Sequence, residues 1–127
     1  MAGSMSGVKL TRRDDDYDMT IFPGTSLSFD LVLYNAGRAE DLTGWSIALT
    51  AVANNGAPVL DLTTANGKAA ILPIGGGGTD ALVNGRVRFE EAAEVTARAQ
   101  NGTWKVMATT PDGRISQIIS GRVGGCK

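Results

Sequence analysis

Acidic residues near the N-terminus are the first groups in this sequence whose type and spacing could do chemistry. Three consecutive aspartates have a fourth close behind them and two arginines directly before them: Asp14, Asp15, Asp16, Asp18, Arg12 and Arg13. Carboxylates bind divalent cations, but a calcium loop spaces its ligands around a turn that contains a glycine and ends in a distal glutamate. Because that spacing is missing, we predict a solvated, charged arm that holds no metal and can contact a partner protein.

A run of four glycines could cradle a phosphate group. The run consists of Gly75, Gly76, Gly77 and Gly78, and Thr79 follows it. A phosphate-binding loop needs a Gly-Lys-Ser/Thr sequence that leads into a helix, so that the lysine reaches the phosphate. No lysine follows this run. We therefore predict a flexible connection between strands, which offers a second candidate contact for a partner and binds no cofactor.

The remaining groups give no catalytic arrangement. Glu90, Glu91 and Glu94 are near neighbours on a predicted helix, whereas paired catalytic carboxylates face each other across a cleft. The chain has no histidine, which excludes Ser-His-Asp and Cys-His nucleophiles and histidine-ligated zinc. Its single cysteine, Cys126, cannot close a disulfide within the chain and is predicted to be a free thiol. We predict a protein that is not an enzyme and needs no cofactor.

The two tryptophans could form an aromatic platform that stacks against a sugar ring. Trp45 and Trp104 both stand in alternating patterns, in phase with Ile47 and Val106 respectively. Alternate residues of a strand point to the same side of the sheet. We therefore predict that both tryptophans are core anchors, and we keep a carbohydrate-binding module as an alternative function.

Length and charge narrow the class of protein further. The 127 residues suit one domain, and 12 Lys and Arg against 13 Asp and Glu give a net charge of −1. Such a chain lacks the clustered basic surface that nucleic-acid binding needs. No stretch approaches the roughly 18 consecutive apolar residues of a membrane span, and residues 1–13 lack the apolar run of a signal peptide. We expect a chain made in the cytoplasm that binds neither nucleic acid nor membrane.

Alternating apolar and polar residues predict a series of short β-strands. The candidates are 21–22, 26–34, 45–53, 59–62, 69–74, 82–89, 103–110 and 115–123. The alanine-rich segment 90–100 predicts one or two helical turns between strands. This pattern indicates an all-β fold, an antiparallel β-sandwich of about seven strands with one short helical connection, and a barrel is the competing closure. We expect a flexible arm at 1–17, the sandwich at 18–123 and a tail at 124–127.

A four-residue motif, Asp41-Leu42-Thr43-Gly44, lies between two predicted strands. Asp41 can accept hydrogen bonds from backbone N–H groups one or two residues later and so close a turn. We predict that Leu42 enters the core and that Thr43 repeats the side-chain-to-backbone bond. Gly44 would supply the positive φ before the next strand. The motif is therefore interpreted as a structural turn and not as a chemical site.

Three segments together resemble a known family. They are the Asp41-Leu42-Thr43-Gly44 motif with Trp45-Ser46-Ile47, the segment Gly102-Thr103-Trp104-Lys105-Val106, and Pro111-Asp112-Gly113-Arg114 followed by Ile118-Ile119-Ser120-Gly121-Arg122-Val123. Over about residues 20–123 the chain is similar to the immunoglobulin-like β-sandwich module of tailed-bacteriophage structural proteins, such as the N-terminal domain of upper baseplate proteins. Trp104 stands where that family usually has a tyrosine.

The resemblance implies an immunoglobulin-like sandwich with a structural function in a virion. The first expectation is an adaptor or assembly module of the tail or baseplate that contacts other virion proteins, in multiple copies within a symmetric assembly. The alternative in the same particle is a capsid decoration or head-fibre protein. Binding is expected in the termini and loops, above all in the arm at 1–17, whose removal should leave stability nearly unchanged and weaken incorporation.

Overall fold

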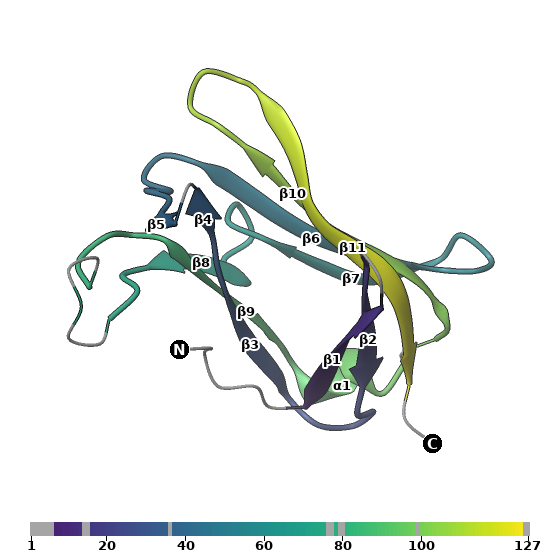
Figure 1. The fold of residues 1–127 in the computed structure, drawn as a ribbon. Coiled ribbons are helices and arrows are strands. Elements are labelled where there is room, and N and C mark those ends of the chain that lie inside the picture. The colour runs from purple at the N-terminus through teal and green to yellow at the C-terminus, as the bar shows by residue number, and fades with distance from the viewer. Residues whose placement is uncertain are drawn as a thin grey trace.

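The computed structural model describes residues 7–13, 16–35, 37–75, 78, 81–98 and 100–125, and these are mostly β-strands (Figure 1). The strands are β1 (Val8–Arg13), β2 (Asp16–Ile21), β3 (Leu27–Val32), β4 (Tyr34–Asn35), β5 (Arg38–Ala39), β6 (Ser46–Ala53), β7 (Pro58–Thr63), β8 (Ala69–Leu72), β9 (Arg86–Glu91), β10 (Gly102–Thr109) and β11 (Ile115–Gly125). One helical turn, α1 (Ala93–Thr96), lies between β9 and β10, which confirms the predicted helical connection. No helix of the described residues is long and apolar enough to cross a membrane.

The strands form two main sheets and a small hairpin. The larger sheet has the order β1-β2-β11-β10-β6-β7, the smaller sheet has the order β3-β9-β8, and β4 pairs with β5. In an immunoglobulin-like sandwich, strands G, F, C and C′ share one sheet and strands B, E and D share the other. β11-β10-β6-β7 and β3-β9-β8 reproduce these two orders. The fold is therefore an immunoglobulin-like β-sandwich, as predicted.

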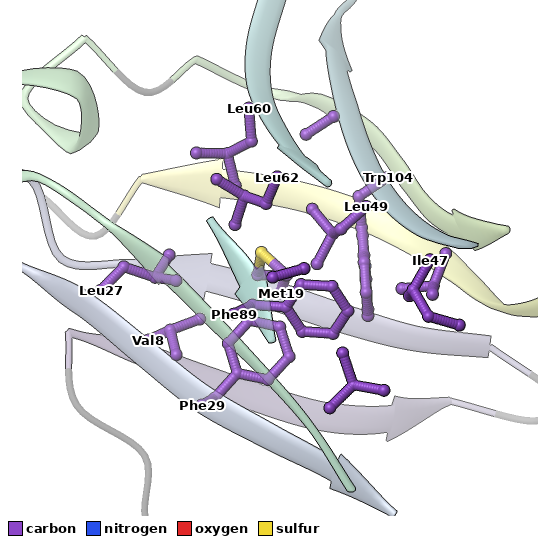
Figure 2. Close-up of a cluster of buried hydrophobic side chains, with 14 of the residues drawn as sticks. Val8, Met19, Leu27, Phe29, Ile47, Leu49, Leu60, Leu62, Phe89 and Trp104 are labelled. Carbon is purple, nitrogen blue, oxygen red and sulfur yellow. The ribbon is translucent and has the colours of Figure 1, made fainter. Parts of the chain in front are cut away.

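Alternate residues of the strands fill one core between the two sheets. On β6, Ile47, Leu49 and Ala51 are buried, and the residues between them reach solvent more. On the smaller sheet, Phe29 and Phe89 lie opposite each other, with ring centroids 5.2 Å apart. Figure 2 shows both rings in one cluster with Leu49 of the larger sheet. Period-two alternation thus commits one side of each strand to the core.

The N-terminal segment differs from the predicted structureless arm at 1–17. β1 and β2 form a hairpin in which Val8 lies opposite Ile21 and Leu10 lies opposite Met19. Val8, Met19 and Ile21 are 5%, 1% and 0% exposed. The segment carries few apolar residues, and only pairing with β2 brings them against the core. The arm prediction is wrong for β1 and the start of β2, so removing residues 1–17 is now expected to destabilise the fold; residues 1–6 lie outside the described residues.

The C-terminal strand differs from the prediction in two ways. β11 continues to Gly125, so the tail predicted at 124–127 does not begin at 124, and Cys126 lies outside the described residues. β11 also pairs with β2 in parallel, with Val123 opposite Met19, so the sandwich is not wholly antiparallel. The two strands come from opposite ends of the chain, and no short turn sets their relative direction.

Candidate functional site

The Asp41-Leu42-Thr43-Gly44 motif forms a turn held by its own side chains. Asp41 Oδ1 accepts two hydrogen bonds from Thr43, one from the backbone N–H at 3.1 Å and one from the hydroxyl at 2.7 Å. The Thr43 hydroxyl thus binds the Asp41 side chain, and not a backbone group as predicted. Asn84 Nδ2 donates to the same hydroxyl at 3.3 Å. The hydrogen bonds from Thr43, with the hydroxyl contributing most, lower the pKa of Asp41.

The other motif residues connect this turn to the core. Leu42 is fully buried, and its N–H donates to the Asn84 carbonyl at 2.9 Å. The Trp45 N–H donates to the Leu42 carbonyl at 3.0 Å and closes the turn before β6. Gly44 has a φ of +83°, and a Cβ there would lie 3.3 Å from Pro111 Cγ. Positive φ favours glycine. Asp41 and Thr43 thus hold the turn, Leu42 fixes it to the core, and Gly44 allows its backbone conformation.

Replacing Asp41 by alanine is expected to lower the melting temperature by a few degrees, because the turn loses the acceptor of two hydrogen bonds. The folded-state pKa of Asp41 is lowered. Its contribution is therefore complete above the unfolded pKa of about 3.9 and disappears as pH falls through the folded pKa. The melting-temperature difference between wild type and variant should shrink below about pH 4.

Asp61→Ala, at an exposed aspartate of β7, is the control for this measurement. Thermal melts at neutral and acidic pH compare the two variants directly. An equal effect at both positions, or an Asp41→Ala effect that persists unchanged at low pH, would show that the carboxylate does not hold the turn.

The two tryptophans differ in burial. Trp104 is 1% exposed, and its Nε1 donates to the Tyr17 carbonyl at 2.8 Å. Gly121 lies opposite Trp104 in the pairing of β10 with β11, and its lack of a side chain leaves room for the Tyr17 backbone. Trp45 packs against the core but is only half-buried. Trp104 is thus a core anchor, whereas Trp45 covers the rim of the core.

The charged residues near the N-terminus were predicted to form an arm, but those that the structure describes lie on the paired strands of the β1–β2 hairpin. Arg12 is exposed on β1, and Arg13 lies opposite Asp16 in the pairing with β2. Asp14 and Asp15 lie outside the described residues. In the part of the chain that the structure describes, no three histidine, cysteine, aspartate or glutamate side chains are grouped closely enough to hold a metal ion.

The glycine run lies in the loop between β8 and β9. The Gly75 N–H donates to the Ala81 carbonyl at 2.9 Å and closes the base of this loop. Gly75 and Gly78 are exposed, and Gly76 and Gly77 lie outside the described residues. The described glycines are therefore at the surface, where a partner could reach them.

The three glutamates considered for catalysis have different environments. Glu91 is buried, and its carboxylate accepts hydrogen bonds from Lys68 Nζ at 2.9 Å and from the Ala92 N–H at 2.8 Å. Glu90 and Glu94 are exposed. Glu91 is thus occupied by an ion pair that joins β9 to the turn before β8.

A buried charge cluster on the smaller sheet was missed by sequence reasoning. The Asp30 side chain is 1% exposed and accepts hydrogen bonds from Arg86 Nη1 at 3.1 Å and from Arg88 Nε at 2.9 Å. The β3–β9 register places Asp30 opposite Arg88. Hydrogen bonding and the charge of Asp30 raise the pKa of Arg88. The sequence shows charged residues in both strands, but it does not show that Asp30 lies opposite Arg88, because that depends on the register of the two strands.

The outer face of the larger sheet is hollowed and carries polar and charged side chains. Two adjoining hollows, of about 400 and about 520 Å³, share Thr103 and Arg122. Asp18 and Lys105 line one hollow each, and the Arg122 N–H donates to Asp18 Oδ1 at 3.4 Å. The face therefore offers hydrogen-bonding groups and charges of both signs, which suit polar contacts with another protein.

The strand order of its two sheets defines this chain as an immunoglobulin-like β-sandwich. No family model and no curated protein sequence matches it. Among solved structures, murine CRIg aligns over 98% of this chain and 100% of its own, with 11% identity and a TM-score of 0.40. CopC from Methylosinus trichosporium OB3b aligns over 94% of this chain and 96% of its own, with 12% identity and a TM-score of 0.37. These alignments carry no argument about function, and the fold assignment rests on the strand order.

Proposed function

We propose that this chain is a non-enzymatic structural protein of a tailed-bacteriophage virion, an adaptor of the tail or baseplate that contacts neighbouring subunits. The observation that carries the proposal is the turn at the entry to β6. Its contacts give the sequence resemblance a physical basis, because Asp41, Leu42 and Thr43 all make contacts that hold the turn or the core. The other segments of the resemblance lie on β10 and β11, which pair with each other.

The larger sheet supports an adaptor function because its two faces are used differently. Residues of β10 alternate in burial: Thr103 and Lys105 are exposed, whereas Trp104 and Val106 are buried. The inner face holds the core, and the polar outer face with its hollows is available for protein contacts. An adaptor of this kind would be made in the host cytoplasm, would act within the virion and would need no cofactor.

Two alternatives differ in how the structure supports them. A capsid decoration or head-fibre protein would use the same fold and the same polar face, so only the position in the particle separates it from a tail adaptor. A carbohydrate-binding module would need an exposed aromatic platform. Trp104 is buried and cannot contribute to one.

Mass spectrometry of purified virions of the encoding phage tests the proposal. The chain is expected in the washed particle at a fixed copy number, and in the tail fraction after heads and tails are separated. Recovery with the heads would favour the capsid-decoration alternative. Absence from the particle would contradict a virion function altogether.

A charge reversal on the outer face is expected to reduce incorporation without unfolding the chain. Lys105 is exposed and lines one of the hollows, so Lys105→Glu should keep the wild-type melting temperature and incorporate several-fold less, measured by quantitative immunoblot. Arg98→Glu makes the same charge change at an exposed residue outside both hollows and should incorporate normally. Equal incorporation of the two variants would place the contact surface elsewhere.

A further inference from the structure

Among the described residues, no strand covers the outer edge of β11 along its first half. β2 pairs with β11 only from Val123 to Gly125, and the earlier residues of β11 follow β10 alone. Figure 1 shows the β10–β11 hairpin projecting beyond the neighbouring strands. Within the described residues, no strand pairs with the outer edge of residues 115–120. Residues 115–120 of β11 therefore pair with β10 on one side and with no described strand on the other side.

Backbone groups on this segment point away from the sheet. The Arg114 carbonyl accepts a hydrogen bond from the Thr110 N–H at 2.8 Å, and Ser116 is the next residue on β11 that faces β10 in this way. Residues that bond to one neighbour of an antiparallel strand alternate with residues that face the opposite side. The N–H and C=O groups of Ile115 and Gln117 therefore face the open edge. Such an edge is a template for another strand.

The side chains of the same segment also favour strand pairing. Residues 115–120 read Ile-Ser-Gln-Ile-Ile-Ser, with no charge, proline or glycine. Ile115 and Ile118 are 66% and 37% exposed. Uncharged segments of about six residues with high β propensity are those that pair edge to edge. Residues 115–120 thus combine free backbone groups with exposed apolar surface.

The other sheet edges carry features that oppose strand addition. On β7, the Asn66 side chain accepts a hydrogen bond from the Thr63 N–H at 3.0 Å and donates one to the Asp61 carbonyl at 2.8 Å. β1 carries Lys9 and Arg12, β3 carries the buried charge cluster, and β8 has only four residues. Charges and short strands are the usual means of protecting an edge. The open half of β11 has no charge and is not short, and its protection is limited to a register shift against β10 between Gln117 and Ile119.

We infer that this edge pairs antiparallel with the same edge of a second copy of the chain, which joins two larger sheets into one. Both copies present the same exposed isoleucines and outward backbone groups, and an antiparallel edge can pair with itself about a twofold axis. The Arg114 side chain, 81% exposed, stands at one end of the open edge, where it forms an exposed ion pair with Asp112 at 3.4 Å that leaves most of its guanidinium accessible. Asp16 Oδ1 stands at the other end, 3.5 Å from Ser120 Oγ. Antiparallel pairing brings these opposite charges together across the interface, whereas parallel pairing would bring like charges together.

Sedimentation of the purified chain over a concentration series tests this inference independently of the virion proposal. A monomer–dimer equilibrium is expected. Ile118→Lys should weaken the dimer at least about tenfold, because Ile118 lies next to the middle of the open edge, where antiparallel pairing would bring the two lysines close together. Gln117→Pro should weaken it similarly, because it removes an outward N–H without breaking the β10 ladder. Val52→Lys is the matched control at an apolar residue, 40% exposed, within β6 of the same sheet.

Hydrogen exchange locates the interface in the same samples. The amides of Ile115 and Gln117 should exchange more slowly as the dimer fraction rises, and all three variants should keep the wild-type circular dichroism spectrum. A chain that stays monomeric throughout overturns the inference, as does a dimer that both edge variants leave intact. Protection of these amides only when another protein is added would assign the edge to that protein. If dimers form while the chain is absent from virions, the virion proposal alone fails.

Discussion

Trp104→Ala is expected to lower the free energy of unfolding by about 3–5 kcal/mol. The indole is 1% exposed and lies in the core cluster near Leu49 (Figure 2), so its truncation leaves a cavity between two sheets that cannot close fully. The substitution also removes the donor of the 2.8 Å hydrogen bond to the Tyr17 carbonyl. Urea denaturation followed by far-ultraviolet circular dichroism measures the loss.

Trp104→Phe is the companion variant. Phenylalanine keeps most of the apolar volume and removes the Nε1 donor, so the expected loss is smaller, about 1–2 kcal/mol. This variant stays measurable even if Trp104→Ala fails to fold. A Trp104→Ala protein as stable as wild type would show that the indole is not the anchor that its burial indicates.

Gly121→Ala is expected to destabilise the fold by about 3 kcal/mol, although it adds only one methyl group. A Cβ at Gly121 would lie 1.8 Å from the Tyr17 carbonyl oxygen and 2.5 Å from its carbon. β2 would have to move away from β11, which breaks the hydrogen bond to Trp104 and shifts Met19 in the core. The same urea titration measures the effect.

Gly78→Ala is the matched control, because a Cβ at exposed Gly78 would meet no atom within 4 Å. Its effect should stay within about 0.5 kcal/mol. The double variant Trp104→Phe/Gly121→Ala should lose less than the sum of the single losses, because both changes break the same hydrogen bond. Equal stability of Gly121→Ala and Gly78→Ala would contradict the close approach of β2 to β11.

The strands with strong alternation could be predicted from the sequence. The segments expected at 45–53 and 103–110 correspond to Ser46–Ala53 of β6 and Gly102–Thr109 of β10. The turn at Asp41 was predictable for a similar reason, because Asp41 and Thr43 bind each other across two positions. Alternation and turn chemistry depend on neighbours in the chain, which a single sequence displays.

The N-terminal hairpin and the buried charge cluster could not be predicted in this way. The hydrogen bond of Trp104 to Tyr17 joins residues 87 positions apart, and Asp30 lies 58 positions from Arg88. Val8 and Leu10 form too short an apolar pattern to indicate a strand without β2 beside them. These contacts contribute free energy only after the two sheets have assembled.

The sequence by itself determined the all-β class, the interior strands, the helical turn and the Asp41 turn, since each is encoded within a few consecutive positions. Only the tertiary structure decided which strands are neighbours, that β2 and β11 run in parallel, and that no strand among the described residues pairs with the outer edge of half of β11. Strand pairing joins residues that are distant in the chain, and its free energy depends on register and on packing against the opposite sheet. The open edge of β11, the candidate surface for pairing with a second copy, exists because β2 pairs only with the end of β11.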